Sequence, residues 1–317
     1  MIDTIAIVGA GYMGGGIAQV FALAGKDVVV SDVSADAALT NRERLVQEAE
    51  QFAAEGLFPA DAAATMDARL TAAPSIEDAV RDADLVIEAV FERIDVKHAI
   101  LARISQASRP NTIIGSNTST ISINRLAETV TAPERFLGVH FSNPAPFIPG
   151  VELIPHETTD DAVVTEVATL LAASGKITAR ISDATGFVLN RLQYALFHEA
   201  TALVDEGVAS VEAIDAIVRT TFGFRLPFFG PFAIADMAGL DVYAFCYASL
   251  QEAFPERFAT PAVLKNLVDN GALGVKSGSG FLNAPPESLA EIVAYRNRAY
   301  VAMARVLEEL GPAPVTY

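Results

Sequence analysis

A glycine-rich segment near residue 10 constrains the fold of this chain more than any other feature. Residues 3–8 form an apolar run typical of a buried parallel strand, and Gly9–Gly14 follow with the spacing G-x-G-x-x-G. Residues 14–24 predict a helix that opens on these glycines, and 27–31 predict a second strand that leads to Asp32. This order predicts a βαβ unit that binds a dinucleotide.

Each glycine of this segment has a physical role in such a unit. Gly9 permits the tight turn, Gly11 lets the backbone approach a pyrophosphate, and Gly14 lets helix and strand pack closely. The helix N-terminus supplies N–H donors and a positive dipole. Cofactor contacts are therefore expected from Gly9, Ala10, Gly11, Tyr12, Met13 and Gly14.

Asp32 selects between the two nicotinamide cofactors. A carboxylate at this strand end can accept hydrogen bonds from ribose hydroxyls, whereas it would repel a 2′-phosphate. The next several residues contain no Arg or Lys that would bind such a phosphate. The sequence therefore predicts NAD rather than NADP.

The pattern of elements divides the chain into two parts. Further strands are expected at 84–88, 111–115, 135–140 and 150–154, with helical segments between them, including 35–55 and 60–68. Strands that alternate with helices predict a doubly wound, Rossmann-type parallel sheet. After about residue 184 only helical periodicity remains, over 186–206, 211–221, 231–254, 260–270 and 287–310. We expect a NAD-binding domain over 1–184 and an all-helical domain over 185–317.

Composition excludes several classes of function. The net charge is −17, and the 22 Lys and Arg form no basic cluster, so a nucleic-acid role is not expected. No apolar run approaches the roughly 20 residues that span a bilayer, and no basic leader is present, so we expect a cytoplasmic protein. The single cysteine, Cys246, excludes an intramolecular disulfide and a cysteine-based metal site, and we expect it to be buried on a helix.

His140 is the candidate catalytic base. Oxidation of an alcohol requires a group that accepts the hydroxyl proton, and histidine titrates near neutrality. Glu152 lies in the next expected strand, where its carboxylate could fix the imidazole tautomer and stabilise the imidazolium ion. Ser119 and a later Asn could donate hydrogen bonds to the carbinol oxygen.

The expected strand ends bring these residues together. Ligands of doubly wound sheets bind at the carboxyl ends of the strands. Five candidate residues fall at such ends and are expected to converge on one crevice: Gly9, Asp32, Glu92, Ser119 and His140.

Taken together, the motifs resemble the 3-hydroxyacyl-CoA dehydrogenase family over nearly the whole chain. The matching strings are Gly9–Gly14, Glu88…Glu92…Lys97, Asn117-Thr118-Ser119, His140…Asn143-Pro144…Glu152, Gly186–Arg191, Gly230-Pro231-Phe232 and Gly239-Leu240-Asp241. The resemblance implies His140 as base, Glu152 as its partner, and Ser119 and Asn190 as substrate contacts. It also implies a helical second domain that binds substrate and forms a homodimer. Residues implied to lie near NAD are Asp32, Glu92, Lys97, Asn117, Ser119 and Asn143.

One segment departs from the acyl-CoA enzymes of the family. Those enzymes place basic and hydroxyl side chains on the long helix after the second strand, where the phosphates of CoA lie. The corresponding stretch here, Glu48–Glu55, has no Lys, and the expected contact positions are Glu48 and Glu55. Carboxylates facing a polyphosphate would repel it.

Two other features resemble the branch of the family that acts on free hydroxy acids, such as gulonate 3-dehydrogenase and carnitine 3-dehydrogenase, and that includes lambda-crystallin. Pro149 precedes Gly-Val-Glu152, and Arg225 sits in a longer segment before Gly230-Pro231. Arg225 could form a bidentate pair with a substrate carboxylate, or it could pair with a structural acid.

We therefore expect a dehydrogenase that transfers hydride between NAD and the 3-hydroxyl of a small hydroxy carboxylate. The alternative is an L-3-hydroxyacyl-CoA dehydrogenase, of which a 3-hydroxybutyryl-CoA dehydrogenase is the simplest form. Lesser alternatives are a pyridine carboxylate alcohol or aldehyde dehydrogenase and a non-catalytic, crystallin-like NAD-binding protein. No metal and no membrane or nucleic-acid partner are expected.

Overall fold

The computed structural model describes residues 2–283 and 285–315, which form two compact units. Unit 1 comprises residues 1–196 and unit 2 comprises residues 197–317. The division falls inside α8 (Leu189–Asp205), whereas the predicted domain boundary at residues 184 and 185 precedes this helix. Each unit is described by itself.

Unit 1 contains one eight-stranded sheet in the order β3-β2-β1-β4-β5-β6-β7-β8. Its strands are β1 (Thr4–Val8), β2 (Asp27–Ser31), β3 (Leu70–Ala72), β4 (Leu85–Glu88), β5 (Ile113–Ser116), β6 (Phe136–Phe141), β7 (Gly150–Pro155) and β8 (Ile177–Arg180). The reversal of order on either side of β1 confirms the predicted doubly wound topology.

One strand pair corrects the expectation of an all-parallel sheet. β6 and β7 are antiparallel, while every other neighbouring pair is parallel. Only residues 142–149 join β6 to β7, and such a short connection cannot make the crossover that parallel strands require. The short β3 and the mostly exposed β8 were not predicted, because neither carries a long apolar run.

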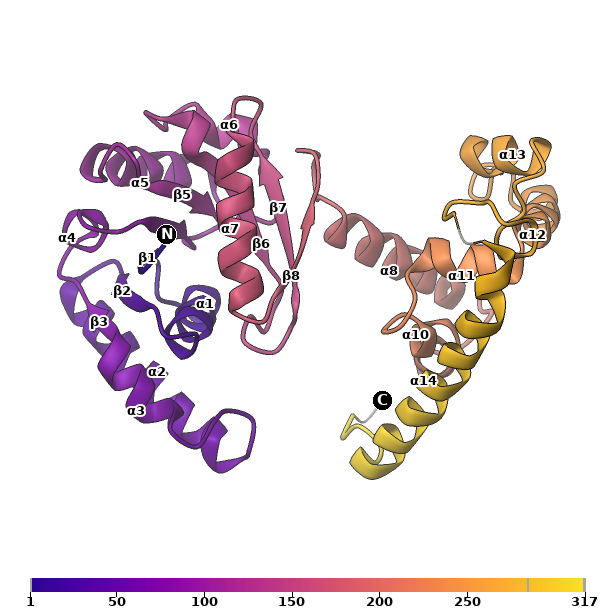
Figure 1. The fold of residues 1–317 in the computed structure, drawn as a ribbon, viewed down its shortest axis with the longest axis horizontal. Helices are drawn as coiled ribbons and strands as arrows, with labels where there is room; N and C mark the ends of the chain where they lie inside the picture. Colours follow the sequence, from indigo (N-terminus) through magenta and orange to yellow (C-terminus); the bar gives the residue numbers. More distant parts are fainter. Residues whose placement is uncertain (1, 284, 316–317) are drawn as a thin grey trace. The chain divides into compact units, whose positions relative to one another are not determined.

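Helices cover both faces of this sheet (Figure 1). One buried apolar cluster includes side chains from α1 (Tyr12–Leu23), α2 (Ala35–Ala54), α3 (Ala62–Arg69) and α7 (Asp161–Ala173). A second cluster includes side chains from α4 (Ile76–Val80), α5 (Ile94–Ala107) and α6 (Ile123–Ala127). Because helices cover both faces, the central strands consist mainly of apolar residues. The polar side chains of these strands lie at or near the strand ends.

Unit 2 is helical, as predicted. It contains the end of α8, α9 (Val211–Thr220), α10 (Phe222–Arg225), α11 (Pro231–Ala238), α12 (Leu240–Ala253), α13 (Ala262–Asp269) and α14 (Leu289–Leu310), with short 3-10 turns at Val275–Ser277 and Pro286–Ser288. The single helix expected over 231–254 is two helices, since Gly239 adopts φ +100° between α11 and α12. This positive φ, which glycine adopts readily, ends the helix.

In the described part of the chain, no single helix has the length and apolar character needed to cross a membrane. Among the described helices, one bent pair would pass that test together, namely α11 and α12, which are bent by 101° where they meet.

Candidate active site

The glycine segment forms the turn between β1 and α1 that the spacing predicts. Gly9 has φ +95°, and a Cβ atom at this position would lie 2.7 Å from the carbonyl oxygen of Ala89. A Cβ atom on Gly14 would lie 1.8 Å from the carbonyl oxygen of Gly9. Only glycine fits at either position, so the backbone path is fixed by the sequence.

Gly11 has the opposite surroundings. It is the N-cap of α1, no side chain caps the helix, and a Cβ atom on Gly11 would meet nothing within 4 Å. The first N–H groups of α1 are therefore open to a ligand, which is the arrangement that holds a pyrophosphate. Tyr12 and Met13 follow at this helix start.

Asp32 lies beside this turn in a pocket of about 360 Å³. Its carboxylate accepts hydrogen bonds from the backbone N–H groups of Ala10, at 2.9 Å, and Val33, at 2.7 Å, and from the Asn41 amide. These contacts fix the carboxylate at the end of β2, where it can also accept bonds from ribose hydroxyls.

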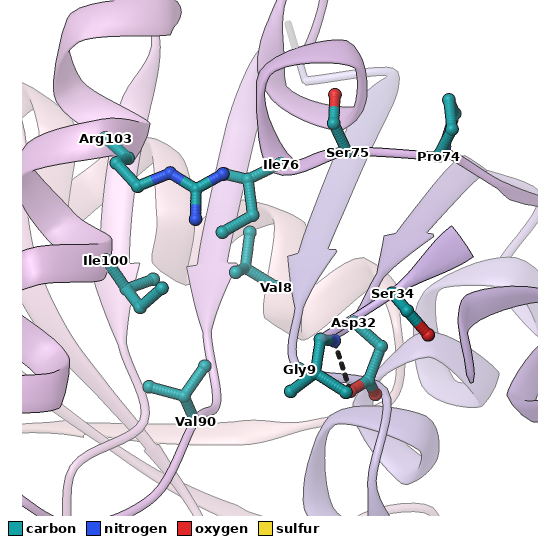
Figure 2. Close-up of a pocket in the computed structure, with 11 residues that line it drawn as sticks. Val8, Gly9, Asp32, Ser34, Pro74, Ser75, Ile76, Val90, Ile100 and Arg103 are labelled. Carbon is teal, nitrogen blue, oxygen red and sulfur yellow. Dashed lines mark hydrogen bonds between the residues drawn. The ribbon is translucent and has the colours of Figure 1, made fainter. Parts of the chain in front are cut away.

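Figure 2 shows the apolar side of the same pocket, lined by Ile76, Val90 and Ile100. Arg103 also lines it, and its guanidinium is held by the Glu77 carboxylate at 2.9 and 3.1 Å. The sequence reasoning missed these residues because they come from α4, α5 and the loop after β4, outside the glycine motif.

A buried ion pair supports the loop after β4. Lys97 is 1% exposed, and its ammonium group donates to the Glu88 carboxylate at 2.7 Å and to the carbonyl oxygen of Val90 at 3.2 Å. The Ser116 hydroxyl donates to the other Glu88 oxygen at 2.6 Å. The predicted contact of Lys97 with NAD stays a prediction; in this structure protein groups surround the ammonium.

Glu92 organises the loop after β5. One of its oxygens accepts hydrogen bonds from the Thr118 hydroxyl at 2.7 Å and from the backbone N–H groups of Ser119 and Thr120, each at 2.8 Å. Partial burial alone would raise the pKa of Glu92, but these hydrogen bonds and the Lys97 charge lower it overall. The carboxylate therefore stays ionised and holds the loop.

Three further predicted residues meet around this loop. Asn117 accepts a hydrogen bond from the N–H of Phe141, which ties the end of β5 to β6. The Asn190 amide donates to the carbonyl oxygen of Ser119 at 3.0 Å. The Ser119 hydroxyl has no hydrogen-bond partner within the described chain, so it is free to bond a substrate oxygen.

His140 and Glu152 form the predicted pair. They are directly opposite each other in the antiparallel register of β6 and β7, and the His140 Nδ1 lies 2.7 Å from a Glu152 oxygen. Both side chains are largely buried, at 5% and 12% exposed. An ionised carboxylate can only accept, so Nδ1 carries a proton, and in the neutral imidazole Nε2 then presents a lone pair.

The segment before α8 completes this pair. The second Glu152 oxygen accepts hydrogen bonds from the N–H groups of Val188, at 2.9 Å, and Leu189, at 3.0 Å. The buried Phe187 ring packs against the imidazole, with 5.5 Å between ring centroids, and its backbone has φ +50°. The sequence reasoning did not assign Phe187 a role, although Gly186-Phe187 was part of the quoted motif.

Two predicted residues take no part in the side-chain hydrogen bonds described above. Asn143 is exposed and precedes a cis peptide bond to Pro144. Arg225 belongs to unit 2, on α10. Within the described residues, no group of three or more His, Cys, Asp and Glu side chains could hold a metal ion.

The acidic stretch on α2 carries less uncompensated negative charge than the sequence predicts. Glu48 is paired with Arg44 at 2.5 Å and accepts a hydrogen bond from Gln19 at 3.2 Å. Glu55 accepts a hydrogen bond from Gln51 and carries no cationic partner in the described chain. The charge of Glu48 is therefore compensated, and the expected repulsion of a polyphosphate is weaker than the sequence indicated.

Two family models match the chain. Residues 4–184 match the NAD binding domain of 3-hydroxyacyl-CoA dehydrogenase, and residues 186–284 match its C-terminal domain. Both matches end before α14. The chain is also 37% identical over 282 residues to the 3-hydroxybutyryl-CoA dehydrogenase of Bradyrhizobium diazoefficiens, covering 89% of this chain and 95% of that protein.

Two other similar proteins match almost end to end. The 5-formyl-3-hydroxy-2-methylpyridine 4-carboxylate 5-dehydrogenase of Mesorhizobium japonicum is 36% identical, covering 97% of this chain and 99% of that protein. The crystal structure of a 3-hydroxyacyl-CoA dehydrogenase from Archaeoglobus fulgidus has a TM-score of 0.78 at 31% identity, covering 98% and 99% of the two chains. Two of these three relatives are named for acyl-CoA substrates, and none of the three is named as a gulonate 3-dehydrogenase, a carnitine 3-dehydrogenase or a lambda-crystallin.

Proposed function

The chain belongs to the 3-hydroxyacyl-CoA dehydrogenase family and is an NAD-dependent oxidoreductase acting on a CH–OH group, and we propose that its substrate is an L-3-hydroxyacyl-CoA thioester. The observation that carries the chemistry is the contact of His140 with Glu152. Removal of a hydroxyl proton requires a base with a free lone pair, and His140 Nε2 is that base.

The residues of the chain divide the work of the reaction. His140 accepts the proton of the 3-hydroxyl group, and Glu152 stabilises the imidazolium ion that results. The Ser119 hydroxyl donates a hydrogen bond to the same oxygen, and the Asn190 amide positions the Ser119 backbone. When bound, NAD supplies the acceptor for the hydride that leaves C3. The open N–H groups of α1 and the Asp32 carboxylate hold that cofactor.

The choice of a CoA thioester departs from our expectation of a free hydroxy acid and takes up the alternative. That expectation depended in part on uncompensated carboxylates at Glu48 and Glu55; Arg44 compensates Glu48, whereas Glu55 has no cationic partner in the described chain. Relatives named as 3-hydroxybutyryl-CoA dehydrogenases are 35–37% identical over 87–89% of the chain. The pairing of Glu48 weakens the objection to a polyphosphate at this position, and the similarity to these relatives supports an acyl-CoA.

A small hydroxy carboxylate is the second candidate. One observation favours it: Arg225 has no acidic partner in the described chain, so it is not the structurally paired arginine that we had considered. The nearly full-length similarity to a dehydrogenase named for a pyridine carboxylate supports the same candidate.

NADH formation from matched substrates tests the proposal. We expect (S)-3-hydroxybutyryl-CoA to exceed free (S)-3-hydroxybutyrate in kcat/KM by at least about tenfold, which corresponds to about 1.4 kcal/mol of transition-state stabilisation from the CoA portion. Turnover that favours the free acid would reject the thioester and support the second candidate. No NAD reduction with either, or with a pyridine carboxylate alcohol, would reject both.

A further inference from the structure

A second pocket, of about 360 Å³, lies wholly within unit 2. Its apolar wall comes from α11, through Ile234, Met237 and Ala238. Its polar side chains are Arg225, Arg296, Asn297 and Tyr300, of which the last three belong to α14. Among the described residues, no acidic side chain lines it.

Aromatic contacts hold the segment 224–229 against α14, on the polar side of this pocket. Tyr300 packs against Phe224 and Phe228, with 5.6 and 6.1 Å between ring centroids, and Tyr295 packs against Phe229 at 5.7 Å. The segment around Arg225 is thereby fixed against α14. Arg225 and the α11 residues lie within the residues matched by the C-terminal family model, whereas α14 lies beyond them.

The two arginines are available to a ligand. Arg225 is half-buried and forms no ion pair within residues 2–283 and 285–315. Arg296, also half-buried, donates to the neutral Asn297 oxygen at 3.2 and 3.0 Å. Elsewhere in this strongly acidic protein, arginines such as Arg42 and Arg257 are held by carboxylates. Partly desolvated guanidinium groups without an anion favour binding one.

We infer that this pocket binds the carboxylate of a small organic molecule. The planar fork of Arg225 matches the two oxygens of a carboxylate, Arg296 adds a second positive charge, and the carbon skeleton packs against Ile234 and Met237. The carboxylate belongs either to the substrate of the enzyme or to a separate ligand. The inference does not depend on which substrate is oxidised, since it concerns binding in unit 2 alone.

Calorimetry on the full chain with benzoate tests this site, with benzamide as the uncharged isostere and inorganic phosphate as the competing anion. We expect saturable benzoate binding, at least tenfold weaker benzamide binding, and no displacement of benzoate by equimolar phosphate. Arg225→Met and Arg296→Met should each weaken benzoate at least tenfold, and Arg225→Lys should give an intermediate loss.

Arg298→Met is the matched control, since Arg298 is exposed on the same helix and does not line the pocket. Benzoate affinity within threefold of wild type in Arg225→Met and Arg225→Lys would overturn the inference. An equal loss in Arg298→Met would overturn it too, because bulk charge would then explain binding. Phosphate that displaces benzoate at equal concentration would likewise reject a carboxylate site.

Kinetics separates the two sources of the carboxylate. (S)-3-Hydroxyadipyl-CoA and (S)-3-hydroxyhexanoyl-CoA have equal chain lengths and differ in the terminal carboxylate. If the group belongs to the substrate, Arg225→Met raises KM for the first compound alone and benzoate competes with it. If it belongs to a separate ligand, benzoate affinity is unchanged at saturating substrate. An enzyme inactive on both thioesters would still bind benzoate, so failure of the proposed function is distinguishable.

Discussion

The two units of this chain use apolar side chains in different ways. Unit 1 buries two large clusters, one on each face of its sheet, and also buries polar side chains that include Glu88, Lys97 and His140. In the described part of unit 2, the buried cluster contains only Ala235, Leu240 and Leu264. Helix α8 has no buried residue along its length.

Unit 2 instead exposes large apolar side chains. Phe197 is 63% exposed and Phe245 is 74% exposed, and Cys246, which we expected to be buried, is exposed beside it on α12. Amphipathic helices need a partner for their apolar face. Unit 1 therefore completes its own core, whereas unit 2 carries apolar faces that another surface must cover. We expect a homodimer to cover them.

The largest expected effect concerns the chemistry of unit 1. His140→Asn should lower kcat by roughly 10²–10⁴-fold, because a positioned general base contributes that much, while NAD affinity stays within about twofold. Steady-state kinetics and NAD titration measure both quantities. Glu152→Gln should cost less, since the imidazole remains.

His156→Asn is the control for this prediction, because His156 lies after β7 and, within the described residues, its ring forms hydrogen bonds with Thr158 alone. Its kcat should match the wild type. Near-normal turnover in His140→Asn would remove this residue from the mechanism.

The next effect tests the apolar surface of unit 2. Light scattering at micromolar concentration should give a mass of twice 33.5 kDa for the wild type. Phe197→Asp should weaken association by about 30-fold, because truncating a central aromatic side chain of an interface costs about 2 kcal/mol or more.

Phe91→Asp provides a matched comparison in unit 1, where Phe91 is 77% exposed. Its mass should remain that of the wild type. A monomeric wild type, or equal weakening by both substitutions, would contradict the contrast between the two units.

The dinucleotide turn was predictable from sequence because each of its constraints is local. Gly9 and Gly14 stand where no Cβ atom fits, and Asp32 ends the next strand. The His140–Glu152 pair required one further step, the antiparallel return of β7, which places residues 12 positions apart opposite each other. The sequence reasoning proposed the pair but assumed an all-parallel sheet.

Other features depended on contacts between distant segments. Arg44 pairs with Glu48 one turn further along α2, and the apolar periodicity of a helix does not indicate which charged side chains form ion pairs. Arg225 on α10 and Arg296 on α14 line the same pocket, but no sequence motif links the two residues. The break at Gly239 was missed because apolar periodicity continues across it.

A smaller effect tests cofactor selection by unit 1. The wild type should bind NAD much more tightly than NADP, and Asp32→Asn should narrow that preference by at least about fivefold, because repulsion between the carboxylate and a 2′-phosphate is about 1 kcal/mol or more. Titration of both cofactors measures the ratio. Asp61→Asn, at an exposed acid before α3, controls for the loss of one charge. A wild type that binds both cofactors within threefold would reject this role of Asp32.

The smallest expected effect is the pH dependence of the stability of unit 1. The folded-state pKa of Glu92 lies below its ordinary value of 4.5, so its ionised form contributes stability above pH 4.5 that is lost as the pH falls through the folded pKa. In Glu92→Gln the remaining oxygen still accepts from Thr118, Ser119 and Thr120, while the attraction to Lys97 disappears. In urea unfolding, the variant should therefore be less stable than the wild type at pH 7, and the difference in stability should shrink towards pH 3.

Glu128→Gln, at an exposed acid after α6, controls for surface charge. A difference that does not change between pH 7 and pH 3 would mean that the charge of Glu92 does not hold the loop.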